Sequence, residues 1–163
     1  MVVKKYYQLG NNSLYPICRS LTGNGVRKTL RIIKKELPKL KIKSIASGSR
    51  AFDWKVPPEW NILDAYVLDK NKKKIIDFKK NNLHLVGYSI PINKFVSKKE
   101  LLDKIHVLPK QKKAIPYITS YYKKYWGFCL SYNEKKKLIK IYKNSDQFKV
   151  IIKSNLNSYG KLN

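Results

Sequence analysis

Apolar residues recur at helical spacing in two stretches near the start of the chain. In residues 6–21 the apolar positions are three or four residues apart, at Leu14, Ile17, Cys18 and Leu21. This spacing predicts one short helix with Pro16 in its first turn.

The second stretch follows the Gly-Asn-Gly sequence at residues 23–25. Its apolar stripe repeats at intervals of four, three and four residues, at Val26, Leu30, Ile33 and Leu37, and basic residues occupy the opposite face. We therefore expect an amphipathic helix that ends before Pro38, with Asn24 or Thr22 as its N-cap.

Beyond Pro38 the pattern changes to short runs rich in β-branched and aromatic residues, separated by turn residues. These runs are residues 41–47, 51–56, 62–69, 73–78 and 83–92. They predict short strands in a small, mostly antiparallel sheet or sandwich, with a hairpin-like turn at residues 69–74.

Two capping boxes follow. Ser97 with Glu100 predicts a helix over residues 98–106, and Ser131 with Glu134 predicts a short basic helix. Two further apolar runs, residues 126–130 and 148–152, predict strands. The whole pattern indicates an α+β chain, with a helical hairpin followed by a small, mostly antiparallel β domain that carries short helices.

The large positive charge of the chain is weak evidence for a dedicated polyanion-binding site. The chain has 163 residues, 36 of them basic, and a net charge of +26. All but four basic residues are lysines, spread along the chain among many Asn, Ile and Tyr residues, which is typical of codon choice in an AT-rich genome. We interpret the lysines mainly as a solvated surface, with nonspecific, salt-sensitive binding to polyanions as a consequence.

Two cysteines, no visible signal peptide and no apolar run of about 18 residues favour a reducing, cytoplasmic setting without a membrane span. Metal chemistry has little support. His84, His106, Cys18 and Cys129 are isolated from one another and match no zinc spacing. We expect His84 to be a hydrogen-bonded core residue and His106 to cap a helix C-terminus.

Three other features admit both a chemical and a structural interpretation. Arg19 could activate Cys18 as a nucleophile, but the place of Cys18 in the apolar stripe favours a packed residue, as does the setting of Cys129. The "TGNGVR" loop could bind an anion at a helix N-terminus, although a tight helix-helix turn is favoured. The acids Asp53, Glu59 and Asp64 give only a weak hint of paired-carboxylate chemistry.

The aromatic cluster "YITSYYKKYW" contains Tyr121, Tyr122, Tyr125 and Trp126. It could be a stacking platform for bases or sugars, or it could cover the domain or form an interdomain face.

Four strings in this order, "LYPICRSLTGNGVRKTLRII", "FDWKVPPEWNILDAYV", "KKIIDFKKNNLHLVGYSIPIN" and "AIPYITSYYKKYWGFCLS", resemble the N-terminal part of an aminopeptidase-like family. This family is related to M28-type zinc exopeptidases and is found among polysaccharide-biosynthesis genes. The resemblance implies that residues 1–48 hold the first helices and strand of a truncated α/β peptidase domain. Residues 49–150 would be an inserted β-rich domain, and residues 151–163 would re-enter the peptidase domain.

The resemblance also implies zinc for the complete protein, but the family's zinc ligands come after the region matched here. We therefore expect no metal site and no catalytic residue in this chain, which would be inactive alone. Arg19, Asn24 and Arg27 would make polar contacts near the domain junction. Tyr121, Tyr122 and Trp126 would shape access of a peptide-like substrate.

The expected partner is a separately encoded C-terminal half or a second copy of the chain. The alternative function is a stand-alone, lysine-rich binding module for nucleic acid or an anionic glycan.

Overall fold

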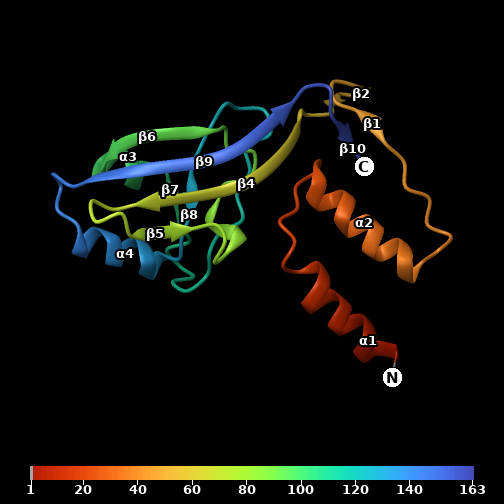
Figure 1. The fold of residues 1–163 in the computed structure, drawn as a ribbon, viewed down its shortest axis with the longest axis horizontal. Helices are drawn as coiled ribbons and strands as arrows, with labels where there is room; N and C mark the ends of the chain where they lie inside the picture. Colours follow the sequence, from red (N-terminus) through yellow and green to blue (C-terminus); the bar gives the residue numbers. More distant parts are fainter. Residues whose placement is uncertain (1) are drawn as a thin grey trace. The chain divides into compact units, whose positions relative to one another are not determined.

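The computed structural model describes residues 2–163, which form two compact units. The first unit comprises the chain up to Asn61 together with Leu156–Asn163, and the second comprises Ile62–Asn155. Helices and small, mostly antiparallel sheets occur together, so the predicted α+β class is confirmed (Figure 1).

The first helical stretch differs from its prediction. Helix α1 spans Val2–Gln8 and continues into a π-helical segment, η1, at Leu9–Leu14. The amide of Tyr15 donates to the carbonyl of Gly10 at 2.8 Å, which closes the last wide turn. The short helix predicted from Leu14, Ile17, Cys18 and Leu21, with Pro16 in its first turn, is therefore wrong, because the helical residues end at Leu14. Pro16 follows the helix, where its missing N–H and fixed φ do not interrupt a hydrogen-bond ladder.

The second helix is confirmed as α2, Asn24–Glu36. Its N-cap is Gly23, which has a φ of +94° and no side chain, so the expected Asn24 or Thr22 cap is wrong. The hydroxyl of Thr22 instead accepts a hydrogen bond from the amide of Trp60 at 3.0 Å. A positive φ is accessible to glycine at little steric cost, which explains the residue at this turn.

The strands of the first unit are very short. β1, Ile45–Ala46, pairs antiparallel with β10, Lys161–Leu162, and β2, Arg50–Ala51, pairs with β3, Trp54–Lys55. These strands lie in or near longer runs of β-prone residues. Each pair remains a separate two-stranded sheet, because no third strand among the described residues pairs with it.

The second unit is built on a four-stranded sheet in the order β5-β4-β9-β6. Its strands are β4, Glu59–Leu68, β5, Lys74–Asp77, β6, Ile92–Ser97, and β9, Gln147–Asn157. The predicted turn between β4 and β5 is confirmed: the Asp69 amide donates to the Lys73 carbonyl at 3.0 Å.

The inward-facing side chains of this sheet form one side of the core. They are fully buried at Ala65, Val67, Ile76, Val96, Phe148, Val150 and Ile152. The alternation places every second residue of each strand on the opposite face.

The apolar run at residues 83–92 was predicted as a strand, which is wrong for most of its length. It begins as a 3-10 turn, η2, at Asn82–His84, and only Ile92 belongs to a strand. Tyr88 has a φ of 64°, which breaks an extended conformation. The backbone is instead tied to a distant loop, with Gly87 donating to Ile118 at 2.8 Å and Ile90 donating to Tyr125 at 2.9 Å.

Both capping signals are followed by helices. α3 spans Lys98–Asp103 and α4 spans Tyr132–Ile141; the full reciprocal capping box forms at Ser131 and Glu134. Helix α3 ends three residues before the predicted end, so His106 lies in β7, Ile105–His106, which pairs with β8, Phe128–Cys129. The expectation that His106 caps a helix is wrong.

Candidate functional site

The first unit contains a polar network centred on Arg27 and Glu59. Arg27 lies in the first turn of α2, and Glu59 begins β4. The two guanidinium nitrogens of Arg27 donate to the two carboxylate oxygens of Glu59, at 2.9 and 2.5 Å. Both side chains are largely shielded, with 23% and 10% of their surfaces exposed. This geometry is the bidentate pairing that arginine makes and lysine cannot.

Neighbouring polar groups complete the network. Glu59 also accepts hydrogen bonds from the Asn61 side chain and from the Lys161 amide, each at 3.0 Å. Arg27 donates to the side chains of Asn24, at 2.8 Å, and Asn163, at 3.3 Å. The network therefore connects α2, β4 and β10.

The network shifts the acidity of both partners. Hydrogen bonding to Arg27, assisted by Asn61 and the Lys161 amide, lowers the pKa of Glu59 to about 2 against the effect of burial. The same hydrogen bond raises the pKa of Arg27. Glu59 is therefore ionised at neutral pH and fixed by donors on several sides, as in a structural carboxylate and unlike a general base with a pKa near 7.

The "TGNGVR" loop has the geometry of a tight turn. The Asn24 amide at the start of α2 donates to the Asn61 side chain at 2.7 Å, and the Arg27 guanidinium is held by Glu59. A Cβ atom on Gly23 would collide with the Trp60 carbonyl, and one on Gly25 with the Cys18 carbonyl. The Asn24 amide and the Arg27 guanidinium are thus already used by protein groups, which favours the structural interpretation.

Arg19 lies outside this network. Its guanidinium donates to the Leu14 carbonyl at 2.7 Å, at the end of η1. Of the three predicted junction residues, the structure therefore brings together Asn24 and Arg27 only.

The cysteines lack the setting of activated nucleophiles. Burial raises the pKa of Cys18 and outweighs the opposing charge of Arg19. Burial also raises the pKa of Cys129, which is fully buried in β8, to about 11. Both thiols are therefore predominantly protonated at neutral pH.

The aromatic cluster is divided between core and surface. Trp126 is only 6% exposed and packs edge-on against Phe128, with ring centroids 6.5 Å apart. Tyr121 packs edge-on against the buried ring of Tyr88 at 4.9 Å, whereas Tyr122 is 64% exposed. Tyr122 is therefore the most solvent-accessible of the three residues proposed to shape substrate access.

The two histidines do not gather metal ligands. His106 Nε2 lies 2.9 Å from the Tyr125 hydroxyl, and burial together with Lys135 and Lys104 lowers the pKa of His106. His84 is half-buried; its Nδ1 lies 3.3 Å from the Asp77 carbonyl and its Nε2 lies 3.8 Å from a Glu134 oxygen.

Within residues 2–163, no group of three or more His, Cys, Asp or Glu side chains could hold a metal ion. The donor set described here therefore does not fit the zinc that the family resemblance implies. Two of the three acids considered for paired-carboxylate chemistry form ion pairs with basic residues instead. Glu59 pairs with Arg27, and a carboxylate oxygen of Asp64 lies 3.3 Å from the Lys79 ammonium.

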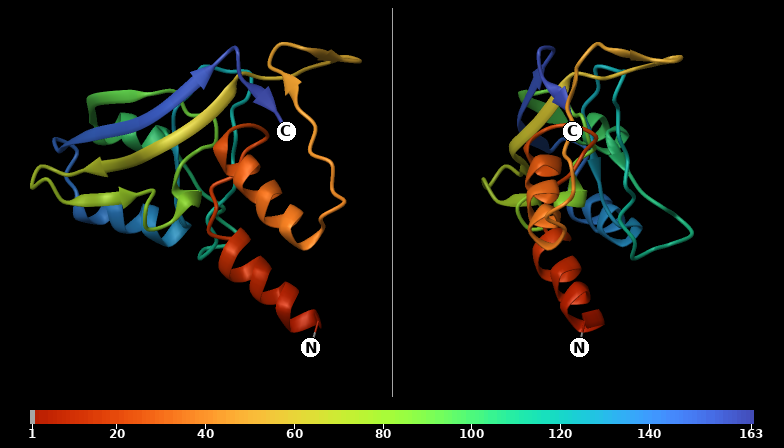
Figure 2. Two further views of the ribbon diagram at one scale, coloured as in Figure 1. Left: turned by 45° about the vertical axis from the view of Figure 1, so that its right-hand side comes forward. Right: turned by 90° about the vertical axis from the view of Figure 1, so that its right-hand side faces the viewer.

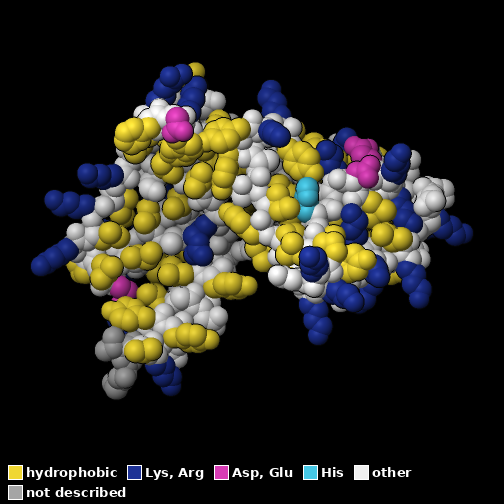
Figure 3. Space-filling model, turned by 180° about the vertical axis from the view of Figure 1, so that it is seen from behind, with side chains coloured by type: hydrophobic (Ala, Val, Ile, Leu, Met, Phe, Trp, Pro, Cys, Tyr) yellow, Lys and Arg dark blue, Asp and Glu magenta, His cyan; other side chains and the backbone are white. Residues whose placement is uncertain are grey.

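An apolar groove of about 350 Å³ lies beside α2 in the first unit. It is lined by the residues Leu30, Leu40, Lys41, Ile42, Lys43, Ile45, Leu162 and Asn163. Ile42 and Ile45 are 37% and 48% exposed, and Figure 3 shows hydrophobic side chains over much of the surface of this unit.

Sequence reasoning missed Glu59 as the centre of the network, and also missed Asn61, Lys161 and Asn163. In the sequence, Glu59 stands out only as one of three acids near aromatic residues. Glu59, Asn61 and Asn163 contact residues of α2 that are more than 30 positions away in the sequence, and Lys161 contacts Glu59 across 102 positions.

In the part of the chain that the structure covers, no helix is long and apolar enough to cross a membrane.

Comparisons with known proteins identify a family and two relatives with peptidase-like descriptions. Residues 59–155 match the family described as "Domain of unknown function (DUF2172)". A Clostridium acetobutylicum protein described as "Putative polysaccharide biosynthesis protein with aminopeptidase-like domain" is 50% identical over 143 residues. The aligned region covers 88% of this chain and 32% of that protein.

A solved structure from Clostridium acetobutylicum, described as a "putative peptidase", is also similar. It is 44% identical with a TM-score of 0.82, and the match covers 99% of this chain and 39% of that chain. The chain thus spans between about a third and two fifths of the length of these relatives. The resemblance to the aminopeptidase-like family is confirmed.

Proposed function

Because the chain belongs to the DUF2172 family and matches only part of each aminopeptidase-like relative, we propose that it is a non-catalytic portion of an aminopeptidase-like zinc hydrolase. Its role is to assemble with a catalytic portion and to shape the approach of a peptide-like substrate. The zinc ligands and the general base belong to that other portion, where bound zinc would polarise the scissile carbonyl and activate water.

The observation that carries the assembly role is the incomplete burial of the first unit. Among the described residues, the fully buried hydrophobic side chains of this unit are Val56 and Trp60, whereas those of the second unit form an extensive core. The α2 stripe and the groove residues Ile42 and Ile45 remain partly exposed. A contiguous apolar surface of this kind is typical of a face that packs against further polypeptide.

The first test is enzymatic. The purified chain, incubated with aminoacyl p-nitroanilides and Zn²⁺, is expected to release no nitroaniline above the buffer rate. Hydrolysis that a chelator abolishes would contradict the proposed inactivity.

The second test is assembly with the remaining two thirds of the Clostridium acetobutylicum relative, expressed as a separate chain. Co-purification is expected, and Ile42→Asp should weaken it by placing a charge in the apolar groove. Leu63→Asp is the matched control, because Leu63 is 78% exposed and belongs to the second unit. Equal capture of wild type and Ile42→Asp would rule out the groove as the assembly surface.

The alternative function is a lysine-rich module that binds polyanions without assembly. The net charge of +26 favours it. Binding that depends on charge alone would fall steeply with salt and would be similar for nucleic acids and acidic glycans.

A further inference from the structure

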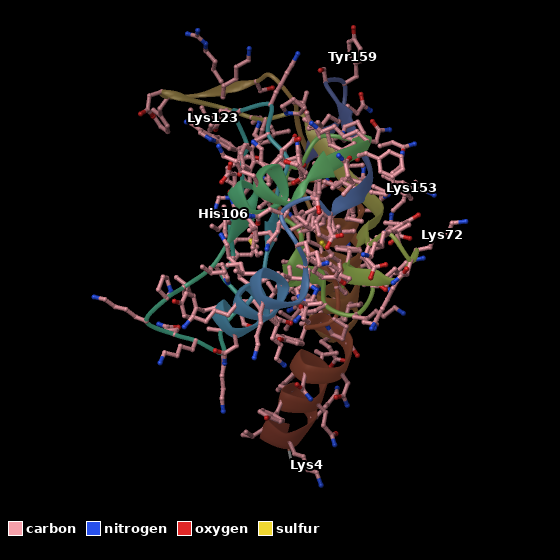
Figure 4. All side chains as sticks on the ribbon, turned by 90° about the vertical axis from the view of Figure 1, so that its left-hand side faces the viewer. Lys4, Lys72, His106, Lys123, Lys153 and Tyr159 are labelled. Carbon is pink, nitrogen blue, oxygen red and sulfur yellow. The ribbon has the colours of Figure 1, made fainter. Side chains whose placement is uncertain are left out.

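One face of the four-stranded sheet in the second unit carries aromatic and lysine side chains. In β9 the side chains of Phe148, Val150 and Ile152 are buried in the core. Alternation along the strand therefore places Lys149 and Lys153 on the other face. Figure 4 shows Lys153 on the opposite side of the sheet from His106.

The neighbouring strands add two aromatic rings to the same face. In β6, Val96 is buried and Phe95 points the other way, with 66% of its surface exposed. In β4, Ala65 and Val67 are buried, which turns Tyr66 outward. Helices α3 and α4 both lie on the core side of this sheet, so no helix of the second unit covers the aromatic face (Figure 2).

Each ring is paired with an ammonium group. Lys149, the register partner of Phe95, has its Nζ 4.5 Å from the centre of the Phe95 ring. Lys74 has its Nζ 4.3 Å from the centre of the Tyr66 ring. Each ammonium thus lies over one side of its ring, so an aromatic surface and a positive charge occur together at two points of the face.

The charge on this face is incompletely neutralised. Its acids, Asp64 and Asp77, lie 3.3 and 3.5 Å from Lys79 and Lys74. Within residues 2–163, no carboxylate lies within ion-pair distance of Lys149 or Lys153. An anionic ligand therefore has charge complementarity with this part of the sheet.

We infer that this face binds an acidic polysaccharide, with sugar rings packed on Phe95 and Tyr66 and carboxylates next to Lys149 and Lys153. The inference goes beyond the proposed function, because it requires neither peptidase activity nor the catalytic portion. Lysine suits isolated carboxylates as a point charge, whereas bidentate recognition of phosphates and guanine uses arginine. All four arginines, Arg19, Arg27, Arg31 and Arg50, belong to the first unit, so the sheet face has none. This distribution favours a glycan over a nucleic acid.

The test uses the whole chain, with hexagalacturonate as the acidic probe and maltohexaose as the neutral one, titrated calorimetrically at 0.15 M salt. Hexagalacturonate should bind, and Phe95→Ala should weaken binding roughly five- to tenfold at constant charge. Lys149→Gln should weaken it as well. Leu63→Ala and Lys99→Gln are controls for an exposed apolar residue and an exposed lysine elsewhere, and neither should change the affinity.

Two results would overturn the inference. One is an equal affinity of wild type and Phe95→Ala for hexagalacturonate, which leaves only nonspecific charge attraction. The other is tighter binding of a single-stranded oligouridylate than of hexagalacturonate, with the same dependence on Phe95, which identifies the face as a nucleic-acid platform. Because Phe95 is exposed, the variant should keep the thermal midpoint of the wild type, and this measurement verifies its folding. Neither result bears on assembly through the groove of the first unit.

Discussion

Arg27 and Glu59 are 32 positions apart in the sequence and form a bidentate ion pair. One guanidinium nitrogen donates to each carboxylate oxygen, at 2.9 and 2.5 Å. This pair attaches the first turn of α2 to the start of β4. Few hydrophobic side chains of the first unit are buried. A well-shielded ion pair therefore contributes a large share of the stability of this unit.

Replacing Arg27 by Ala should destabilise the first unit by about 3 kcal/mol, because it leaves a shielded carboxylate without its main partner. Lysine should restore little of this loss, since it cannot donate two parallel hydrogen bonds. Hydrogen exchange of peptides covering α2 and residues 56–61 measures the effect locally. Arg31→Ala, at an exposed position of the same helix, is the control and should leave exchange unchanged.

The Glu59 carboxylate should make the stability of the first unit depend on pH under acidic conditions. Its pKa is lowered from 4.5 to about 2 in the folded chain. The stabilisation is therefore complete above about pH 4.5 and is lost as the pH falls toward 2. Unfolding measured at several pH values should show a smaller change over this interval in Glu59→Gln than in wild type. Parallel pH curves for the two proteins would contradict this assignment.

Gly25→Ala should destabilise α2, although alanine ordinarily favours a helix over glycine by about 1 kcal/mol. The reason is steric, because a Cβ atom at position 25 would collide with the backbone carbonyl of Cys18. Gly10→Ala, in η1, is the matched control: nothing lies within 4 Å of its added Cβ, so the variant should be neutral or more stable. The thermal midpoint of Gly25→Ala should fall below that of the wild type, whereas the midpoint of Gly10→Ala should stay equal or rise.

Lys98 shows that some lysines have a structural role. Its side chain is mostly buried, and its ammonium donates to the carbonyls of Ile139 and Tyr142 at 2.9 and 2.5 Å, at the C-terminal end of α4. Lys98→Met should cost about 1–3 kcal/mol, because two carbonyl groups lose their donor. Lys99→Met changes the charge equally at an exposed position, and chemical denaturation of the second unit should distinguish the two variants.

Local sequence determined the elements whose stability depends on nearby residues. The α2 stripe, the turn between β4 and β5, and the cap at Ser131 follow from contacts within a few positions, so their patterns were sufficient to predict them. The aminopeptidase-like family was also recognisable, because long ordered strings identify a family before any fold is known.

Tertiary structure alone decided the site. Glu59 is an ordinary acid in the sequence, and its low pKa arises because Arg27, Asn61 and the Lys161 amide converge on it from distant segments. The run at residues 83–92 has strand composition, but its backbone hydrogen bonds go to the loop at residues 118–127, and a positive φ at Tyr88 ends its extension. Hydrophobic periodicity encodes which face of a segment is buried, whereas the partner that buries it depends on the global packing of the chain.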